Sequence, residues 1–466
     1  AVAPQAGAAW APWTSAAAPL SPSTTLSTGS TVRGAMLHHG GSLGSSAESM
    51  GSRSPGVPRN IAYAIALALT SFLSGGLIMG TAPFQDQLVA RFGYSDARAV
   101  QATGRAFQVF VFGSALLAPS VDLAGPRPCA VAGLACEALC LFIIANAAHV
   151  SDKALSLALG CMGVGGNLLT YASMTFPALY KDAGSAAAGD ETSGRSYDGL
   201  LTSVMSAAYQ LSGFVFCLLT VFDFVAFFTC YAILAAIGAC VALACYPDDA
   251  YRSSADAVRW CRGCSLPARG PSSCGAQISL RPLRSARAWL FFLSFGVTAS
   301  CGNWGLNSFF SVAGASKALI QWMPILANAT FVFAPCVGAL VDAVGFGAPV
   351  VSLGVWTVAF CGAISCLPLE WHWLTLVALN ILQAHVYSLQ FMYIAKNYEA
   401  FGFMMAVSCL VQSAVGTLFL LLPSNDLRLA AALFSGLTAP LCAAWAVADS
   451  RRRRRPGDRG AADPGG

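Results

Sequence analysis

Twelve apolar segments, each about as long as a helix that crosses a bilayer, follow one another along this chain. About 30 Å of hydrocarbon takes roughly 20 residues of helix to cross. Since 56% of the 466 residues are hydrophobic and only 10% are charged, one soluble core cannot bury them all. We predict an all-α membrane protein with twelve transmembrane helices. The segments lie near residues 61–82, 102–121, 128–147, 154–179, 200–221, 224–245, 288–312, 318–341, 348–368, 372–394, 402–422 and 428–448.

An Asp-x-x-Gly turn follows an apolar segment twice, over residues 122–127 and again over residues 342–347. Each copy comes after the second segment of a set of six. We therefore predict two six-helix repeats, an N-terminal half over residues 60–246 and a C-terminal half over residues 288–448. This is the architecture of the major facilitator transporters, in which two halves pack around a central cavity.

The repeated turn has a physical rationale. Gly125 permits a tight reversal, and the carboxylate of Asp122 lies where a helix N-terminus or Arg127 can meet it. A simple turn requires the glycine but not a repeated acid. We interpret Asp122, Gly125, Arg127, Asp342 and Gly345 as conformational latches that form in one transporter state and break in the other. Only the first copy is followed by a cation, so we predict that Asp122→Asn impairs transport more than Asp342→Asn.

The distribution of cations predicts the topology. Only six of the 26 Lys and Arg residues fall on the side opposite to the N-terminus, and cations stay in cytosolic loops. Both termini are therefore predicted cytosolic, as are the linker 247–287 and the basic tail 449–466. Residues 1–59 are expected to be disordered, either as a flexible tail or as an organellar targeting leader. We expect the plasma membrane as the location, with an organellar membrane as the alternative.

Several short motifs resemble those of solute carrier family 43, the family of L-type amino acid transporters 3 and 4. They lie at residues 122–127, 163–170, 203–212, 335–345 and 398–403. The resemblance extends over roughly residues 60–448 and implies sodium-independent transport of neutral amino acids. A related group, the apicomplexan amino acid transporters, is equally compatible, and some of its members carry cationic or aromatic substrates.

Helices one, four, seven and ten line the pathway in this architecture, and here they carry amides, hydroxyls and glycines. Such groups bind a zwitterion without a net charge, and bare glycine backbone lets a ligand approach main-chain amides. The alternative role of these residues is to let helices pack closely, and both roles stay open for each residue. The predicted substrate-binding residues, including one from helix five, are Ser74, Gly75, Gly166, Asn167, Thr170, Tyr171, Tyr209, Asn303, Trp304, Asn307, Gln383, His385 and Tyr387.

The middles of these four segments contain no Asp, Glu, Lys or Arg. Coupled carriers need an ionisable residue in the pathway, and only His385 titrates there. We therefore predict uniport, with proton coupling as the alternative. Two intramembrane charges lie elsewhere, Glu137 in the third segment and Arg105 at the outer start of the second. Either they pair across adjacent helices or Glu137 is protonated, and a structural role is favoured over coupling.

Other classes of function find little support in the sequence. Enzyme motifs are absent, so no catalytic residues and no cofactor are expected. Cys261, Cys264 and Cys274 lack the fourth ligand of a zinc site, so no metal is expected. The net charge of +5 follows from the topology and predicts no nucleic-acid partner.

The expected partners are a small solute and membrane lipid, and the chain is expected to be monomeric. The alternatives are a carrier of a cationic amino acid, nucleoside or organic acid, and a non-transporting nutrient sensor.

Overall fold

The computed structural model describes the chain in nine stretches that cover most of the predicted helices. These are residues 58–74, 81–146, 151–177, 198–247, 281–312, 329–368, 371–398, 400–420 and 427–453. The predicted N-terminal tail, the linker and the end of the basic tail lie largely outside the described residues.

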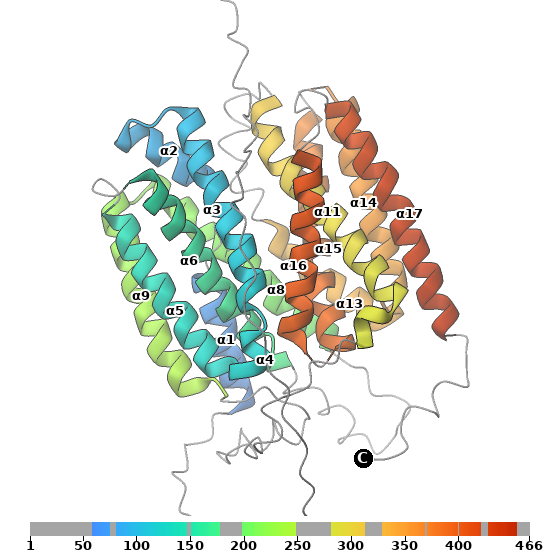
Figure 1. Cartoon of the computed structure of the whole chain (residues 1–466), viewed down its shortest axis with the longest axis horizontal. Coiled ribbons are helices and arrows are strands. Elements are labelled where there is room, and N and C mark those ends of the chain that lie inside the picture. The colour runs from blue at the N-terminus through green and yellow to red at the C-terminus, as the bar shows by residue number, and fades with distance from the viewer. Residues whose placement is uncertain are drawn as a thin grey trace, which may run out of the picture. The chain divides into compact units, whose positions relative to one another are not determined.

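The described helices form two groups, coloured blue to green and yellow to red in Figure 1. The first group is α1 (Arg59–Leu73), α2 (Thr81–Phe92), α3 (Asp96–Leu117), α4 (Ser120–Ala124), α5 (Pro126–Ala145), α6 (Asp152–Ser173), α8 (Asp198–Val215), η3 (Phe216–Thr220) and α9 (Phe224–Cys245). The second is η5 (Arg281–Arg284), α11 (Ala286–Val312), η6 (Ala329–Val332), α13 (Ala334–Val344), α14 (Gly347–Cys366), α15 (His372–Asn397), α16 (Phe401–Leu420) and α17 (Leu427–Arg453).

Nine helices among the described residues are long and apolar enough to cross a membrane, and α1 and α13 are shorter apolar helices. They support an integral, multi-pass membrane protein. The count of twelve stays a prediction. The first predicted span differs from the structure, because α1 ends at Leu73 and a separate helix, α2, begins at Thr81.

Local sequence explains where several helices begin. The side chains of Ser95, Ser151 and Asp223 each accept a hydrogen bond from a backbone N–H in the first turn of α3, α6 and α9. Such caps satisfy donors that the helix itself leaves free. Between α4 and α5 the chain reverses at Gly125, where φ is 93°, and Pro126 begins α5. A residue with a side chain rarely adopts this φ, so the turn requires glycine.

Helices α5 and α6 approach each other closely through two glycines. A Cβ atom at Gly133 would lie 2.5 Å from the carbonyl oxygen of Gly165, and one at Gly165 would lie 2.4 Å from that of Gly133. Both distances are far below contact, so neither position accepts a larger residue. Small residues allow this backbone approach between membrane helices, where packing rather than the hydrophobic effect drives association.

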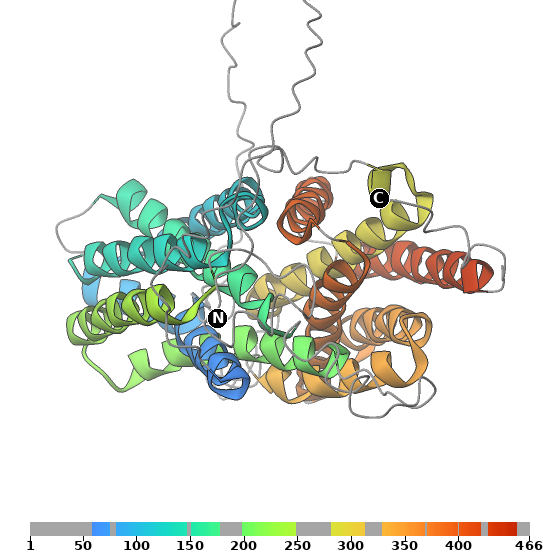
Figure 2. The ribbon, with the colours of Figure 1, turned by 90° about the horizontal axis from the view of Figure 1, so that it is seen from below.

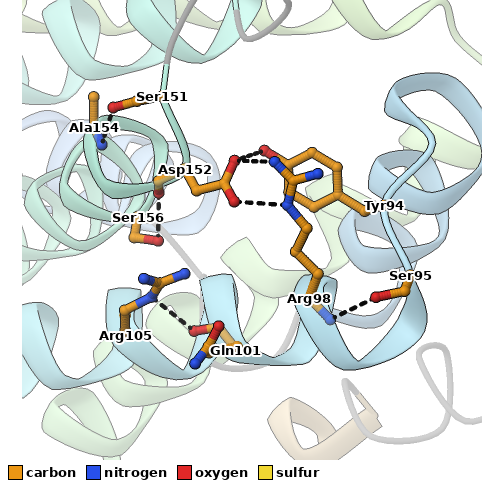
Figure 3. A network of polar contacts seen from close by, with 9 residues as sticks. All are labelled: Tyr94, Ser95, Arg98, Gln101, Arg105, Ser151, Asp152, Ala154 and Ser156. Atoms are coloured by element: carbon orange, nitrogen blue, oxygen red, sulfur yellow. Dashed lines mark hydrogen bonds and ion pairs between the residues drawn. The ribbon is translucent and has the colours of Figure 1, made fainter.

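A polar clamp joins the beginnings of α3 and α6 (Figure 3). The guanidinium of Arg98 donates from Nε to Asp152 Oδ2 over 2.7 Å and from Nη2 to Asp152 Oδ1 over 2.8 Å. Tyr94 donates its hydroxyl to Asp152 Oδ1 over 2.6 Å, and the Arg98 guanidinium lies 4.0 Å from the centre of its ring. Burial raises the pKa of Tyr94, and the bond to Asp152 raises it further, so the hydroxyl keeps its proton. The clamp fixes one end of the first group.

A buried ion pair joins α11 to α17 in the second group. Arg287 pairs with Asp449, a residue that is only 4% exposed. The Arg287 guanidinium also lies 5.4 Å from the Trp445 ring and 5.7 Å from the Tyr393 ring. Aromatic faces stabilise a cation that has been removed from water. This pair therefore fixes the end of α17 from which the basic tail continues.

The two groups contact each other through few elements. Helix α16 of the second group packs against α3 and α4, and helix α8 of the first packs against α13 and α15. Figure 2 shows the two groups from below. The polar atoms at these crossings define the candidate site.

We predict that Asp152→Asn lowers the thermal unfolding temperature of the purified protein by a few degrees, because the bidentate pair with Arg98 is lost. Tyr94→Phe removes one hydrogen bond and keeps the ion pair, so its effect is expected to be smaller. A thermal shift assay in detergent measures both. An unchanged unfolding temperature in Asp152→Asn would show that the clamp does not stabilise the fold.

Candidate functional site

The carboxylate of Asp122 binds the N-terminus of a helix in the other group. Its Oδ1 accepts a hydrogen bond from the backbone N–H of Gly402 over 3.1 Å, and its Oδ2 accepts one from Phe403 over 2.8 Å. Both donors lie in the first turn of α16, where the free N–H groups and the helix dipole favour an anion. Arg127 in turn donates from Nε to the Tyr246 carbonyl oxygen over 2.6 Å, which fastens the turn to the end of α9.

The carboxylate of Asp342 makes the same contact in the opposite direction. Its Oδ1 accepts from the N–H of Gly199 over 3.0 Å and its Oδ2 from that of Leu200 over 2.8 Å, in the first turn of α8. Asp342 lies in the last turn of α13 in the second group and binds a helix of the first. Figure 1 shows α4 and α13 at the same end of the bundle, at the bottom of the view.

Backbone packing repeats along with the hydrogen bonds. A Cβ atom at Gly402 would lie 2.1 Å from the carbonyl oxygen of Ala118, four residues before Asp122. One at Gly199 would lie 2.9 Å from the carbonyl oxygen of Gly338, four residues before Asp342. Each carboxylate therefore reaches its helix because a glycine allows the two backbones to approach. The two contacts are equivalent by position and by chemistry.

The similar geometry of the two aspartate contacts differs from the sequence-based prediction, which ranks Asp122 above Asp342. Both aspartates accept two backbone N–H groups, and a hydrogen bond to a charged group contributes roughly 1.5–3 kcal/mol. Asp342 also has a cation nearby, since Lys396 Nζ of α15 lies 4.0 Å from its Oδ1. The cation that the second turn lacks in sequence is thus supplied by another helix. The geometry gives no reason to rank one contact above the other.

A small cavity lies between the two groups. Its volume is about 40 Å³, which holds a few water molecules but not an amino acid. None of the described residues that line it is Asp, Glu, Lys, Arg or His. The lining consists of Phe107, Phe110, Val111 and Ser114 of α3, Asn167 and Tyr171 of α6, Tyr209 of α8, Tyr387, Gln390 and Phe391 of α15, and Met405, Cys409 and Gln412 of α16.

Four of the predicted substrate-binding residues line this cavity: Asn167, Tyr171, Tyr209 and Tyr387. The amide nitrogen of Asn167 donates to the Ser114 hydroxyl over 2.8 Å, so these two lining groups hold each other. Tyr171 places its hydroxyl 3.9 Å from the sulfur of Cys409, a contact between the two groups.

Other predicted residues of the first group have partners within their own group. Ser74 donates to the Thr70 carbonyl oxygen over 2.6 Å and lies 3.5 Å from that of Tyr209, between α1 and α8. Thr170 donates to the Gly166 carbonyl oxygen one turn earlier in α6, over 3.0 Å. Gly75 lies outside the described residues.

The predicted residues of α11 and the rest of α15 also lie away from the cavity lining. The Trp304 ring packs 5.5 Å from that of Phe434, and Asn303, its neighbour in α11, is half-buried. Gln383 is buried beside α11 at Gly302. The side chain of Asn307 is not among those described. His385, the last of the predicted residues, contacts helix α14.

His385 is fully engaged within the second group. Its Nε2 lies 3.1 Å from the Ser352 hydroxyl of α14, and its Nδ1 lies 2.8 Å from the Ile381 carbonyl oxygen of α15. Both ring nitrogens thus have a protein partner. The only titratable residue expected in the pathway therefore has a place in helix packing.

Sequence reasoning missed the contribution of α3 and α16 to the cavity. Phe107, Phe110 and Phe391 resemble ordinary lipid-facing or core residues in an apolar segment, and no pattern in the sequence separates them. Gln390 and Gln412 could have been recognised from the sequence as candidate lining residues, because an amide in an apolar segment requires a polar partner. Ser114 was detectable for the same reason.

Glu137 lies within α5 and is fully buried. Its two carboxyl oxygens have no hydrogen-bond partner among the described residues. The pairing with Arg105 is not formed, since Arg105 donates from Nε to the Gln101 carbonyl oxygen of its own helix over 3.3 Å. Glu137 instead packs against Gly165 of α6. A Cβ atom added to Gly165 would lie 3.3 Å from the Cβ atom of Glu137. It is not part of the cavity lining.

Comparison with known proteins identifies the fold. No protein-family model and no curated protein sequence matches the chain. A mutant of the nucleoside transporter NupG matches with a TM-score of 0.51 and 13% identity, over 82% of this chain and 98% of that chain. The proton:xylose symporter XylE, a major facilitator superfamily protein bound to 6-bromo-6-deoxy-D-glucose, matches with a TM-score of 0.51 and 16% identity, over 83% of this chain and 94% of that chain. The chain therefore has the major facilitator fold. At these identities the comparison shows the fold alone, and the relationship to solute carrier family 43 stays a prediction.

We predict that Asp122→Asn and Asp342→Asn weaken their own contacts equally, because each replaces an acceptor by an amide that faces a backbone donor. Backbone amide exchange is expected to speed up about tenfold or more at Gly402 and Phe403 in the first variant and at Gly199 and Leu200 in the second. Hydrogen exchange with mass spectrometry measures both. The unmutated contact in each variant is the matched control. Faster exchange in the Asp122 variant alone would support the ranking that the sequence predicts.

We predict that Glu137→Gln leaves the rate of uptake and its pH dependence unchanged. The carboxyl group lies in the packing of α5 against α6 rather than in the cavity, and glutamine preserves its shape. Uptake into liposomes from acidic to neutral pH measures this. A variant that loses pH dependence while it still folds would instead make Glu137 a coupling residue.

Proposed function

We propose that this chain carries a small neutral solute across a membrane by alternating access, with neutral amino acids as the substrate class. The observation that carries the proposal is the cavity with an uncharged described lining, to which residues of both helix groups contribute. A site that both groups form opens to one side or the other as the groups rock. The fold, which NupG and XylE share, supports the same mechanism.

The two aspartate contacts supply the bistable element of this mechanism. They close one end of the bundle, which the topology predicts to be cytosolic, and they consist of hydrogen bonds rather than of an extensive apolar interface. Breaking four charge-assisted hydrogen bonds is costly, but water can take their place once the ends separate. Asp122, Gly125, Arg127, Asp342 and Gly345 are in this proposal the latch of a conformation that is open to the opposite side.

The absence of charge from the described cavity lining bears on both the substrate and the coupling. A cationic or anionic solute would require an opposite charge in a site of low dielectric. A driving proton would require a titratable group that the substrate can sense. His385 is hydrogen-bonded within the second group, and Glu137 is buried beside α6, outside the described cavity lining. Uniport of a neutral solute therefore agrees best with the cavity.

We predict that liposomes containing the purified full-length chain take up labelled neutral amino acids down their gradient, and that a sodium or proton gradient does not drive accumulation. Empty liposomes and lysine, arginine and glutamate are the controls. Gradient-driven accumulation would contradict uniport. Uptake of a nucleoside or sugar but of no amino acid would contradict the proposed substrate class. No uptake of any solute would favour the alternative of a non-transporting nutrient sensor.

A further inference from the structure

Three arginines are crowded at the start of α11. Arg281 and Arg284 lie in the short helix η5, and Arg287 is the second residue of α11. The first turn of α11 contains no acidic residue to offset them. A helix N-terminus carries a partial positive charge, so cations are unfavourable there. The positive-inside rule explains arginines in the neighbouring loop, but it does not explain why they lie at this unfavourable position.

The end of α17 adds further arginines at the same place. Arg287 pairs with Asp449, and α17 then continues with Arg451, Arg452 and Arg453. Residues 281–287 and 449–453 together contain six arginines and one aspartate, a net charge of +5 for two short segments. Because the ion pair joins the two segments, this charge is concentrated at one end of the second group of helices.

The interior of this cluster has more hydrogen-bond donors than acceptors. The indole N–H of Trp445 and the Nε of Arg287 are buried, and neither has a hydrogen-bond partner among the described residues. The Arg287 guanidinium lies 5.4 Å from the Trp445 ring, so the two unpaired donors belong to neighbouring side chains. A buried donor without an acceptor is costly. An anion beside the cluster would offset its excess of positive charge.

Apolar side chains are exposed next to these arginines. Trp289 of α11 is 40% exposed, and its indole N–H donates to the Leu283 carbonyl oxygen of η5 over 2.7 Å. This bond holds Trp289 against η5, which carries the exposed Arg284. On α17, Val447 is 49% exposed and lies one turn before Arg451. Tryptophan is enriched at the level of the lipid headgroups. The surface therefore has a cationic half and an apolar half.

We propose that this surface, formed by the start of α11 and the end of α17, binds an anionic phospholipid. The phosphate of the headgroup lies at Arg284 and at residues 451–453, and the acyl chains lie along Trp289 and Val447. A soluble anion would match the cationic half alone, whereas a phospholipid matches both halves. The site is on the lipid-facing surface of the second group, so it does not depend on which solute the chain carries.

Quenching of tryptophan fluorescence by brominated lipids tests the proposal. The full-length chain is reconstituted in phosphatidylcholine that contains a minor fraction of phosphatidylglycerol or phosphatidylcholine brominated near the headgroup. The quenching that is lost in Trp289→Phe reports on this surface. We expect phosphatidylglycerol to bind there about fivefold or more tightly than phosphatidylcholine, and added salt to reduce the preference. Equal quenching by the two lipids would overturn the proposal.

Matched substitutions locate the binding. Arg284→Gln is expected to lower the preference about two- to fivefold, because it removes one exposed cation. Lys153→Gln removes an exposed cation at the start of α6, at the opposite end of the bundle, and is expected to leave the preference unchanged. An unchanged preference in Arg284→Gln, or an equal loss in both variants, would overturn the site. Competition by soluble glycerophosphoglycerol as strong as that by the intact lipid would overturn a phospholipid as its occupant.

Discussion

Each group of helices holds the other through a carboxylate that binds the start of a helix. Asp122 binds the first turn of α16 and Asp342 binds that of α8, each through two backbone N–H groups. A helix N-terminus presents unpaired donors and a partial positive charge, so an acid is the natural partner. The glycines at 402 and 199 bring the backbones close enough for the bonds to form. The repeated Asp-x-x-Gly turn of the sequence thus becomes a pair of reciprocal contacts at one end of the bundle.

The cavity shares two helices with these contacts, because α8 and α16 carry the bound N-termini and also line the cavity. Within each group the helices are joined by the Arg98–Asp152 clamp, the Gly133–Gly165 crossing and the buried Arg287–Asp449 pair. Between the groups there are the hydrogen bonds of the two aspartates, the close glycine approaches beside them and aromatic contacts. A boundary closed by hydrogen bonds that water can replace fits a rocking motion of the two groups.

The sequence alone predicted an all-helical membrane protein and drew attention to both aspartates, because an acid repeated at a membrane edge requires a partner. It could not identify that partner, since Gly402 lies 280 residues from Asp122 and Gly199 lies 143 residues from Asp342. Asn167 and Tyr209 were predictable as polar groups in apolar segments. Phe107, Phe110 and Phe391 were not, because a phenylalanine that lines a cavity has the same sequence signature as one that faces lipid. His385 was predicted in the pathway, yet its ring binds Ser352 of a neighbouring helix.

The distance between the ends of α4 and α13 tests the central claim most directly. Leu123 and Val344, which are 55% and 51% exposed, are suitable positions for a pair of spin labels, one on each group. In the membrane-reconstituted chain the account predicts a population at short distance, and a shift to longer distances when Asp122 and Asp342 are both replaced by Asn. An identical distance distribution in the two proteins would contradict the claim that the paired carboxylates hold this end closed.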